Sequence, residues 1–323
     1  MSSNPRPDLA PDPSLSRAEM EALQSVIAEA AIFEDDFAFD PAAVTASLEH
    51  PTSKSVGGQT TLTQDGDRDQ EQDHDNEHGH DHEQDREQEH DHDLDDPPLV
   101  AGVDQSFLLE REPEQALSAI VVVQAGEVVE RTAAVTPLEI PYIPGLLAFR
   151  EGGPILEAVE TLSCDPDLFL FDGSGRIHFR QAGIATHMGV VVDVPSIGVA
   201  KSLLCGNPVD DLEGLETGSR VAIEAGSGSR VDAPAGTLLG YAVQTRQYES
   251  PNRHINPLYV SPGHRIGPET AADIVCGLTA GYKLPEPVRL ADQYADEAKR
   301  EHCLDSDHDH DHGHDRDHDH DLE

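Results

Sequence analysis

LVAGVD, at residues 99–104, is a short apolar run that ends on Asp104. LFLFD, at residues 168–172, ends on Asp172 in the same way. Such runs predict buried strands, and functional sites in open α/β sheets form at the carboxyl ends of the strands. A carboxylate there is costly unless it is paired, hydrated or bound to a metal. Two of them favour an Mg²⁺ site, although aspartates that simply cap two loops are a common alternative.

The sequence around these two runs predicts a mixed α/β core. A capping box at Ser16 and Glu19 begins a helix over residues 17–33, and Pro268 begins another that runs to residue 278. We expect further strands at 119–123, 128–129, 221–224, 238–244 and 258–260, and further helices at 155–162 and 287–300. The fold class is therefore α/β, with helices that flank a mixed sheet.

Charge divides the chain into parts. The 323 residues include 63 acidic and 21 basic ones, for a net charge of −42. Two tracts rich in Asp and His, at 65–96 and 305–323, cannot bury enough apolar surface to fold, so we expect both to be disordered. The predicted organisation is a leader and a helix packed on the core (1–49), a disordered linker (50–97), a catalytic domain (98–301) and a disordered tail (302–323).

Composition also indicates the cellular setting. Only four of the basic residues are lysines, and low lysine with a large acidic excess predicts a salt-rich cytoplasm, where a Debye length of ~3 Å at ~1 M salt screens self-repulsion. We therefore expect a halophilic source, with an ordinary acidic protein as the alternative. No apolar run approaches the roughly 20 residues of a membrane span, and the N-terminus lacks a signal peptide's apolar stretch. The four widely spaced cysteines fit a reducing compartment.

Four further stretches of the core form a recognisable set of motifs. They are PYIPGLLAFRE at 141–151, DGSGRIH at 172–178, GVAKS at 198–202 and NPLYVSPGHR at 256–265. Occurring together in this order, they resemble the endonuclease V family of deoxyinosine 3′-endonucleases over residues 99–278. The resemblance implies a ribonuclease H-like fold and a DNA repair activity. It also implies Mg²⁺-dependent cleavage, with Mn²⁺ as a substitute, at the second phosphodiester bond 3′ to a deaminated base in DNA that contains deoxyinosine.

The resemblance assigns catalytic roles to five residues. Asp104, Glu151 and Asp172 match the family's acidic metal-binding cluster, and Lys201 matches the lysine near the scissile phosphate. His264 matches a histidine beside that cluster, where it would hold water or act as an acid or base. A structural histidine in a loop is the alternative for His264.

The resemblance also assigns residues that contact DNA. Tyr142 matches the wedge that fills the space left by an extruded nucleotide, and a core tyrosine is the alternative. The pocket around the flipped base would be formed by Gly145, Leu147, Gly173, Gly183 and Ile184, with His178 at a further motif position. Phe179 departs from the family, which usually has proline there, and this puts the shape of the loop in doubt.

Two other functions remain open at this point. The preferred substrate could be RNA that contains inosine, because no sequence feature separates the two nucleic acids. Alternatively, the protein could be a metal-buffering protein with a degenerate nuclease core, since imidazole in the His/Asp tracts can bind transition metals. The intact set of Asp104, Glu151, Asp172 and Lys201 argues against degeneracy. A monomer is expected, and the sequence identifies no protein partner.

Overall fold

The computed structural model describes residues 5–49, 96–228, 230–248 and 253–311. Almost all of the expected linker at 50–97 lies outside these residues, as does the end of the tail at 312–323. The expectation that these two segments are disordered therefore stays a prediction.

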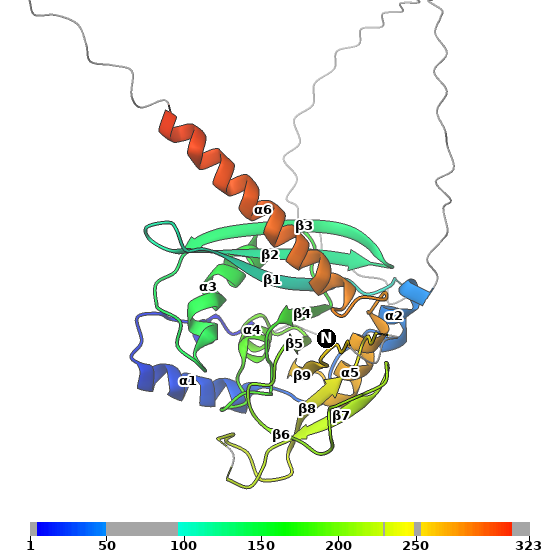
Figure 1. Cartoon of the computed structure of the whole chain (residues 1–323). Coiled ribbons are helices and arrows are strands. Elements are labelled where there is room, and N and C mark those ends of the chain that lie inside the picture. The colour runs from blue at the N-terminus through cyan, green and yellow to red at the C-terminus, as the bar shows by residue number, and fades with distance from the viewer. Residues whose placement is uncertain (1–4, 50–95, 229, 249–252, 312–323) are drawn as a thin grey trace, which may run out of the picture. The chain divides into compact units, whose positions relative to one another are not determined.

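A nine-stranded mixed sheet forms the centre of the molecule, with strand order β3-β2-β1-β4-β5-β9-β8-β7-β6 (Figure 1). The strand β1 pairs in parallel with β4, and β4 pairs in parallel with β5, whereas the remaining pairs are antiparallel. The bounds are β1 Val100–Leu108, β2 Gln115–Gln124, β3 Glu127–Pro137, β4 Leu168–Asp172, β5 Ser196–Ala200, β6 Asn207–Pro208, β7 Arg220–Glu224, β8 Leu238–Val243 and β9 Leu258–His264.

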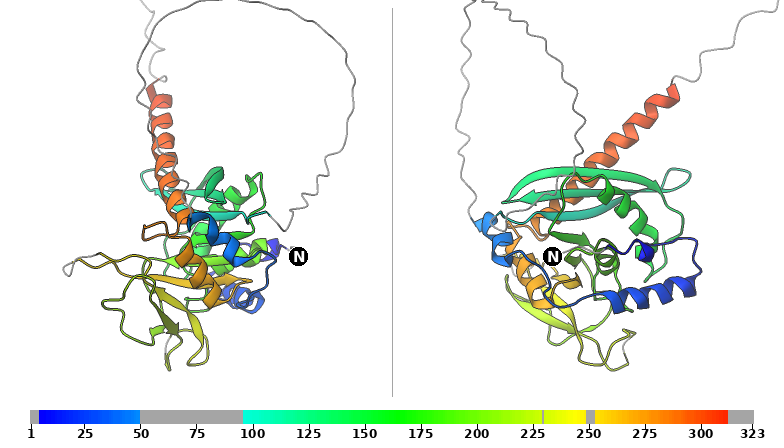
Figure 2. Two further views of the ribbon diagram at one scale, coloured as in Figure 1. Left: turned by 90° about the vertical axis from the view of Figure 1, so that its right-hand side faces the viewer. Right: turned by 180° about the vertical axis from the view of Figure 1, so that it is seen from behind.

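Helices cover both faces of this sheet, as the views in Figure 2 show. On one face lie α2, α5 and α6, whose apolar side chains share a core with Val100 and Leu170. On the other face α3 and α4 pack on Ala101 and Phe171, and α1 packs on α4 from outside. The bounds are α1 Arg17–Ala30, α2 Pro41–Glu49, α3 Leu147–Glu160, α4 Ile184–Val192, α5 Pro268–Gly277 and α6 Glu286–Asp311, with a 3₁₀ turn at Pro7–Leu9. The mixed sheet flanked by helices confirms the predicted fold class.

The structure differs from the sequence-based expectation in several elements. The strand β1 does not end at Asp104 but continues to Leu108, and β2 and β3 are also longer than expected. The helix α3 begins at Leu147 rather than 155, because its burial on the sheet outweighs the helix-breaking tendency of Gly152, Gly153 and Pro154. The helices α2 and α4 and the strands β5 and β6 were not expected. The helix α1 ends at Ala30 rather than at residue 33. The helix α6 continues to Asp311, past the expected domain end at 301, and no Gly or Pro occurs in the sequence from 288 until Gly313.

Gly102 fixes how closely α6 approaches the sheet. A side chain on Gly102 would place its first carbon 2.1 Å from the carbonyl carbon of Pro287, at the start of α6. Only a residue without a side chain therefore fits below the first turn of this helix.

Within the described ranges, no helix combines the length and the apolar character that a membrane crossing requires.

We predict that Gly102→Ala destabilises the fold by at least about 2 kcal/mol, because the added methyl group must displace backbone rather than a flexible side chain. Gly153→Ala is the matched control, since nothing lies within 4 Å of the added carbon and alanine favours the helix. Denaturant unfolding in high KCl measures both. Equal stability of Gly102→Ala and the unmodified protein would contradict the account.

Candidate metal centre

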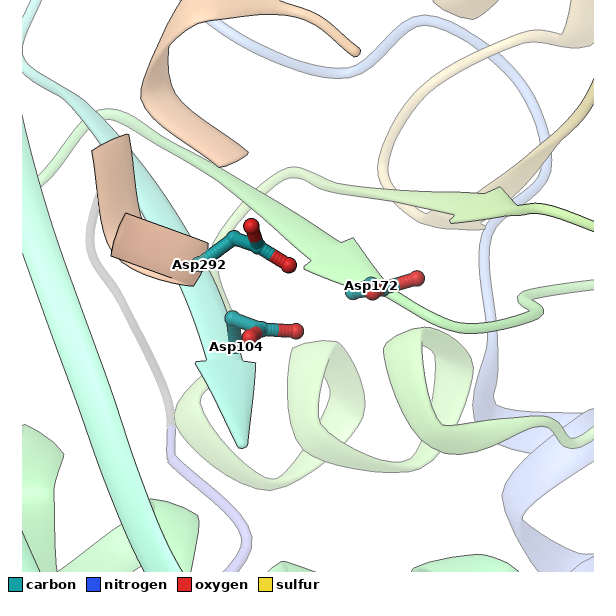
Figure 3. Close-up of side chains that lie close together, drawn as sticks. All are labelled: Asp104, Asp172 and Asp292. Carbon is teal, nitrogen blue, oxygen red and sulfur yellow. The ribbon is translucent and has the colours of Figure 1, made fainter. Parts of the chain in front are cut away.

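Three aspartates meet where β1, β4 and α6 come together. Each of Asp104, Asp172 and Asp292 offers a carboxylate oxygen, and these oxygens all lie within 4.8 Å of one another (Figure 3). This grouping brings together two of the three acidic residues that the sequence assigned to a metal, and it adds Asp292, which the sequence did not single out.

The parallel pairing of β1 with β4 explains the first two positions. Val103 lies opposite Phe171, so the next residues, Asp104 and Asp172, follow side by side. Successive side chains of a strand point to opposite faces. Asp104 therefore points to the same face as Gly102, which is the face that α6 covers.

The third position follows from the close approach of α6. Pro287 lies over Gly102, and Asp292 comes five residues later, or about 7.5 Å along the helix. With α6 packed this closely on β1, the Asp292 carboxylate comes within 4.8 Å of those of Asp104 and Asp172.

Three ionised carboxylates this close together repel one another when no cation lies between them. Burial, followed by the charge of Asp172 and a hydrogen bond with it, raises the pKa of Asp104 to about 8. Lys201, which follows β5, compensates in part: its Nζ lies 2.7 Å from Asp172 Oδ2 and 3.7 Å from Asp292 Oδ1. Burial alone would lower the pKa of Lys201, but the hydrogen bond and charge of Asp172 together with the charges of Asp104 and Asp292 raise it. Three carboxylates and one ammonium leave an excess of negative charge, and hard oxygen ligands of this kind fit a divalent cation such as Mg²⁺.

Glu151 lies apart from the three-carboxylate group, on the first turns of α3. Its side chain is buried, and burial, opposed by the charge of Arg150 and reinforced by that of Asp172, raises its pKa to about 7. Gln105, next to Asp104 on β1, donates a hydrogen bond from Nε2 to the Glu151 carbonyl at 3.0 Å. Glu151 is thus held near the cluster without belonging to it, and a carboxyl group that titrates near neutral pH is suited to proton transfer.

His264 lies at the opposite end of the sheet, so the expectation that it sits beside the metal cluster is wrong. It pairs with Ser196 at the start of β5, whereas Asp172 pairs with Val199 near the end of that strand. The Ile32 N–H donates to its Nδ1 at 3.2 Å, which leaves Nε2–H to donate to Asp193 Oδ1 at 3.0 Å. Both ring nitrogens are occupied, and burial lowers the pKa of the imidazole. His264 is therefore a structural residue that holds the segment after α1.

The predicted wedge, Tyr142, projects from the loop between β3 and α3. Its side chain is 63% exposed, so a core tyrosine is excluded. The loop ends at Gly145, whose φ of +83° favours glycine. The Gly145 carbonyl accepts two hydrogen bonds, from Gln24 Nε2 on α1 at 2.8 Å and from His178 Nε2 at 3.1 Å. His178 Nδ1 accepts from the Arg180 N–H at 3.3 Å, and burial lowers the pKa of this histidine to about 4, so it is a neutral anchor of the wedge loop.

The remaining predicted pocket residues occupy two places. Gly173 directly follows Asp172, and a side chain on it would collide with Ile184 Cγ2 at 2.6 Å. Gly183 precedes α4 and lies against the Ser174 carbonyl, at 2.1 Å from the carbon that a side chain would add. Leu147 begins α3, two residues after Gly145. The structure thus places Gly173, Gly183 and Ile184 together next to the metal cluster, while Gly145 and Leu147 belong to the wedge loop and the helix that follows it.

A mixed sheet with an acidic cluster where the parallel pairing of β1 with β4 ends is the framework of a metal-dependent nuclease with a ribonuclease H-like fold. Comparison with known proteins gives the particular family. The model of the family described as Endonuclease V matches residues 82–293, and the chain belongs to the endonuclease V family. It is a nuclease of that family.

The chain is 53% identical over 295 residues to endonuclease V of Haloarcula marismortui, covering 91% of this chain and 96% of the relative. It is 48% identical over 296 residues to the Natronomonas pharaonis protein, covering 92% and 97%. Both relatives come from halophilic archaea, which confirms the expectation drawn from charge. Endonuclease V of Streptomyces avermitilis has a similar structure, with a TM-score of 0.60 at 26% identity over 89% of this chain and 95% of that one.

We predict that the affinity of the cluster for Mg²⁺ rises with pH. Because Asp104 titrates at about 8, its carboxyl group holds a proton at pH 6 that a cation must displace. Binding should be at least about tenfold weaker at pH 6 than at pH 8. Calorimetry in high KCl measures it, with Asp104→Asn as the control that subtracts binding by the His/Asp tracts. Equal affinity at the two pH values would contradict the prediction.

We predict that His264→Ala lowers the free energy of unfolding by at least about 1.5 kcal/mol, because the Ile32 amide and the Asp193 carboxylate lose their shared partner. Folded His264→Ala should retain its Mg²⁺ affinity and nuclease activity within about threefold. Asp292→Asn should show the opposite pattern, with activity lost and stability almost unchanged. Loss of activity in folded, stable His264→Ala would restore a role for this histidine in the chemistry.

Proposed function

We propose that this protein is a DNA repair enzyme that hydrolyses the second phosphodiester bond 3′ to deoxyinosine, with Mg²⁺ as its cofactor and Mn²⁺ as a substitute. The convergence of Asp104, Asp172 and Asp292 beside Lys201 carries the proposal. A structure similar to this one supports the substrate. Endonuclease V of Ciona intestinalis, with a TM-score of 0.51 at 29% identity over 63% of this chain and 86% of that chain, was crystallised with a 24mer DNA that contains an inosine followed by a ribo-adenosine.

The three aspartates would hold the cation, which when bound neutralises charge on the phosphate and acidifies water. Lys201 is 49% exposed on its side chain, so its ammonium can move from the carboxylates to the phosphate and stabilise the negative charge that develops there. Glu151, with a pKa of about 7, would accept a proton from the attacking water. This assignment extends the predicted acidic set by Asp292 and removes His264 from the chemistry.

Recognition would depend on extrusion of the damaged base. Extrusion costs a few kcal/mol, and least at a mismatched base, which already favours lesions. The exposed ring of Tyr142 would replace the lost stacking, and the anchors on Gly145 keep its loop in place. Gly173 and Gly183, with Ile184, would form the part of the base pocket nearest the metal, where backbone can approach the edge of the base closely.

RNA that contains inosine is the second candidate substrate. The ribo-adenosine after the inosine in the Ciona complex shows that a ribonucleotide is accepted beside the lesion in that structure. A metal-buffering protein with a degenerate core is disfavoured by the complete acidic cluster. We further propose a monomer that acts in the cytoplasm, with nucleic acid rather than a membrane as its partner.

We predict cleavage in high KCl with Mg²⁺ of an oligonucleotide that carries one deoxyinosine, at the bond one nucleotide 3′ to the lesion. An unmodified strand and Asp104→Asn should give no product. An RNA strand with one inosine is run in parallel, and faster cleavage of that strand would move the function to RNA processing.

We predict that Tyr142→Ala lowers kcat/KM on the deoxyinosine strand at least about tenfold, because the wedge no longer offsets the lost stacking. Tyr282→Ala is the matched control, since Tyr282 is also exposed and lies away from the wedge loop. It should change kcat/KM less than twofold. Equal effects of the two substitutions would contradict the role of Tyr142.

A further inference from the structure

A groove of about 660 Å³ lies beside the wedge loop and is not explained by the metal cluster or by the base pocket. Its lining combines three arginines with an apolar floor and one acidic residue: Arg17, Arg180, Arg230, Ile143, Pro144, Phe179, Leu204 and Glu21. Ile143 and Pro144 directly follow Tyr142, so one wall of this arginine groove is the wedge loop itself. In a chain with a net charge of −42, three arginines around one groove make a local positive site.

Contacts hold the three arginines of the groove in place, and the single carboxylate among them does not cancel their positive charge. Glu21 is shared by two of them, with Arg17 Nε at 2.9 Å from Oε1 and Arg180 Nη2 at 2.9 Å from Oε2. Arg180 Nη1 also donates to Gln24 Oε1 at 3.1 Å, and Gln24 holds the Gly145 carbonyl of the wedge loop. Among the residues that the structure describes, Arg230 forms no ion pair, and its guanidinium lies 4.7 Å from the centre of the Phe179 ring.

Phe179 connects the groove to the wedge. Its ring packs against Gly145, at 3.0 Å from the carbon that a side chain there would add. The Phe179 carbonyl accepts a hydrogen bond from the Asp232 N–H at 2.7 Å, and Gln181 Nε2 donates to the Asp232 carbonyl at 2.8 Å. These bonds fix the loop between β7 and β8, which carries Arg230, to the loop that carries Phe179. The groove is therefore preformed, and its lining comes from five separate segments of the chain.

The chemistry of this lining matches a nucleotide. Guanidinium groups bind phosphate through paired hydrogen bonds, and aromatic and apolar side chains support the face of a base. Such short-range contacts persist at high ionic strength, where long-range attraction of a polyanion is screened. A groove that combines them suits a nucleic-acid partner in a salt-rich cell better than a broad basic surface would.

We propose that the arginine groove is a second nucleic-acid subsite, which takes a nucleotide of the strand that flanks the extruded base. The groove holds the phosphate between Arg17 and Arg230 and supports the base on Ile143, Phe179 and Leu204. This subsite rests on the proposed function, because it assumes that Tyr142 opens a nucleic-acid strand beside it. It would help to set the length of strand that the enzyme needs.

The test compares protein variants with substrate truncations. Arg230→Ala and Arg17→Ala are measured with the full chain in high KCl on deoxyinosine strands that have long flanks on both sides, or a flank shortened on one side at a time. Arg246→Ala is the matched control, because Arg246 is also exposed and also lies over an aromatic ring, Tyr248. KM and kcat are determined separately for each combination.

Both groove variants should raise KM about five- to tenfold on the long strand, with kcat within twofold of the unmodified protein and with Arg246→Ala unchanged. One of the shortened strands should raise the KM of the unmodified protein by the same factor. On that strand the groove variants should show no further increase in KM. An equal loss on long and shortened strands, no loss at all, or the same loss in Arg246→Ala would overturn the subsite.

Failure of the proposed function is distinguishable from failure of the subsite. If the unmodified protein cleaves no deoxyinosine strand, the proposed function is wrong, and fluorescence anisotropy with the same labelled strands applies the same comparison to binding. If deletion of residues 65–96 or 305–323 removes the difference between Arg230→Ala and the unmodified protein, the occupant of the groove is an acidic tract of this chain, and the nucleic-acid subsite is overturned.

Discussion

Repulsion between the carboxylates of Asp104 and Asp172 is the constraint on which the rest of the site depends. In-register parallel pairing of β1 with β4 forces the two side chains together at the end of the sheet, and burial raises the pKa of Asp104 to about 8. The neighbouring groups offset this negative charge. Lys201 bridges Asp172 and Asp292, and the three carboxylates suit a divalent cation as ligands. Gly102 is part of the same arrangement. Because it has no side chain, α6 can approach β1 closely enough to bring Asp292 to the other two aspartates.

The N-terminal helix serves the other half of the site. Gln24 on α1 and His178 after β4 hold one carbonyl oxygen, that of Gly145, and thereby fix the loop that presents Tyr142. Different elements therefore position the two parts of the site: β1, β4 and α6 hold the metal cluster, whereas α1 and the loop at 176–181 hold the wedge loop. A substitution in α1 should therefore affect recognition while it leaves the metal cluster intact.

Sequence reasoning predicted the fold class and the pair Asp104 and Asp172, because two apolar runs followed by aspartate indicate two buried strands. The predicted strand end is right for β4 at Asp172 and wrong for β1, which continues past Asp104 to Leu108. It missed Asp292, since nothing in RLADQYADEAKR, at 289–300, separates that carboxylate from Asp296 or Glu297. The packing of α6 on the sheet brings Asp292 to the cluster. His264 was misplaced because the motif does not reveal strand direction: β9 runs antiparallel to β5, so its last residue lies at the opposite end of the sheet from the metal cluster.

The central claim, that three carboxylates from β1, β4 and α6 form one cation site, is tested most directly by anomalous diffraction from crystals soaked in Mn²⁺. The account predicts an anomalous peak between Asp104, Asp172 and Asp292, with the ammonium of Lys201 moved away from Asp172. Peaks confined to other side chains, with Lys201 still bridging Asp172 and Asp292, would contradict it.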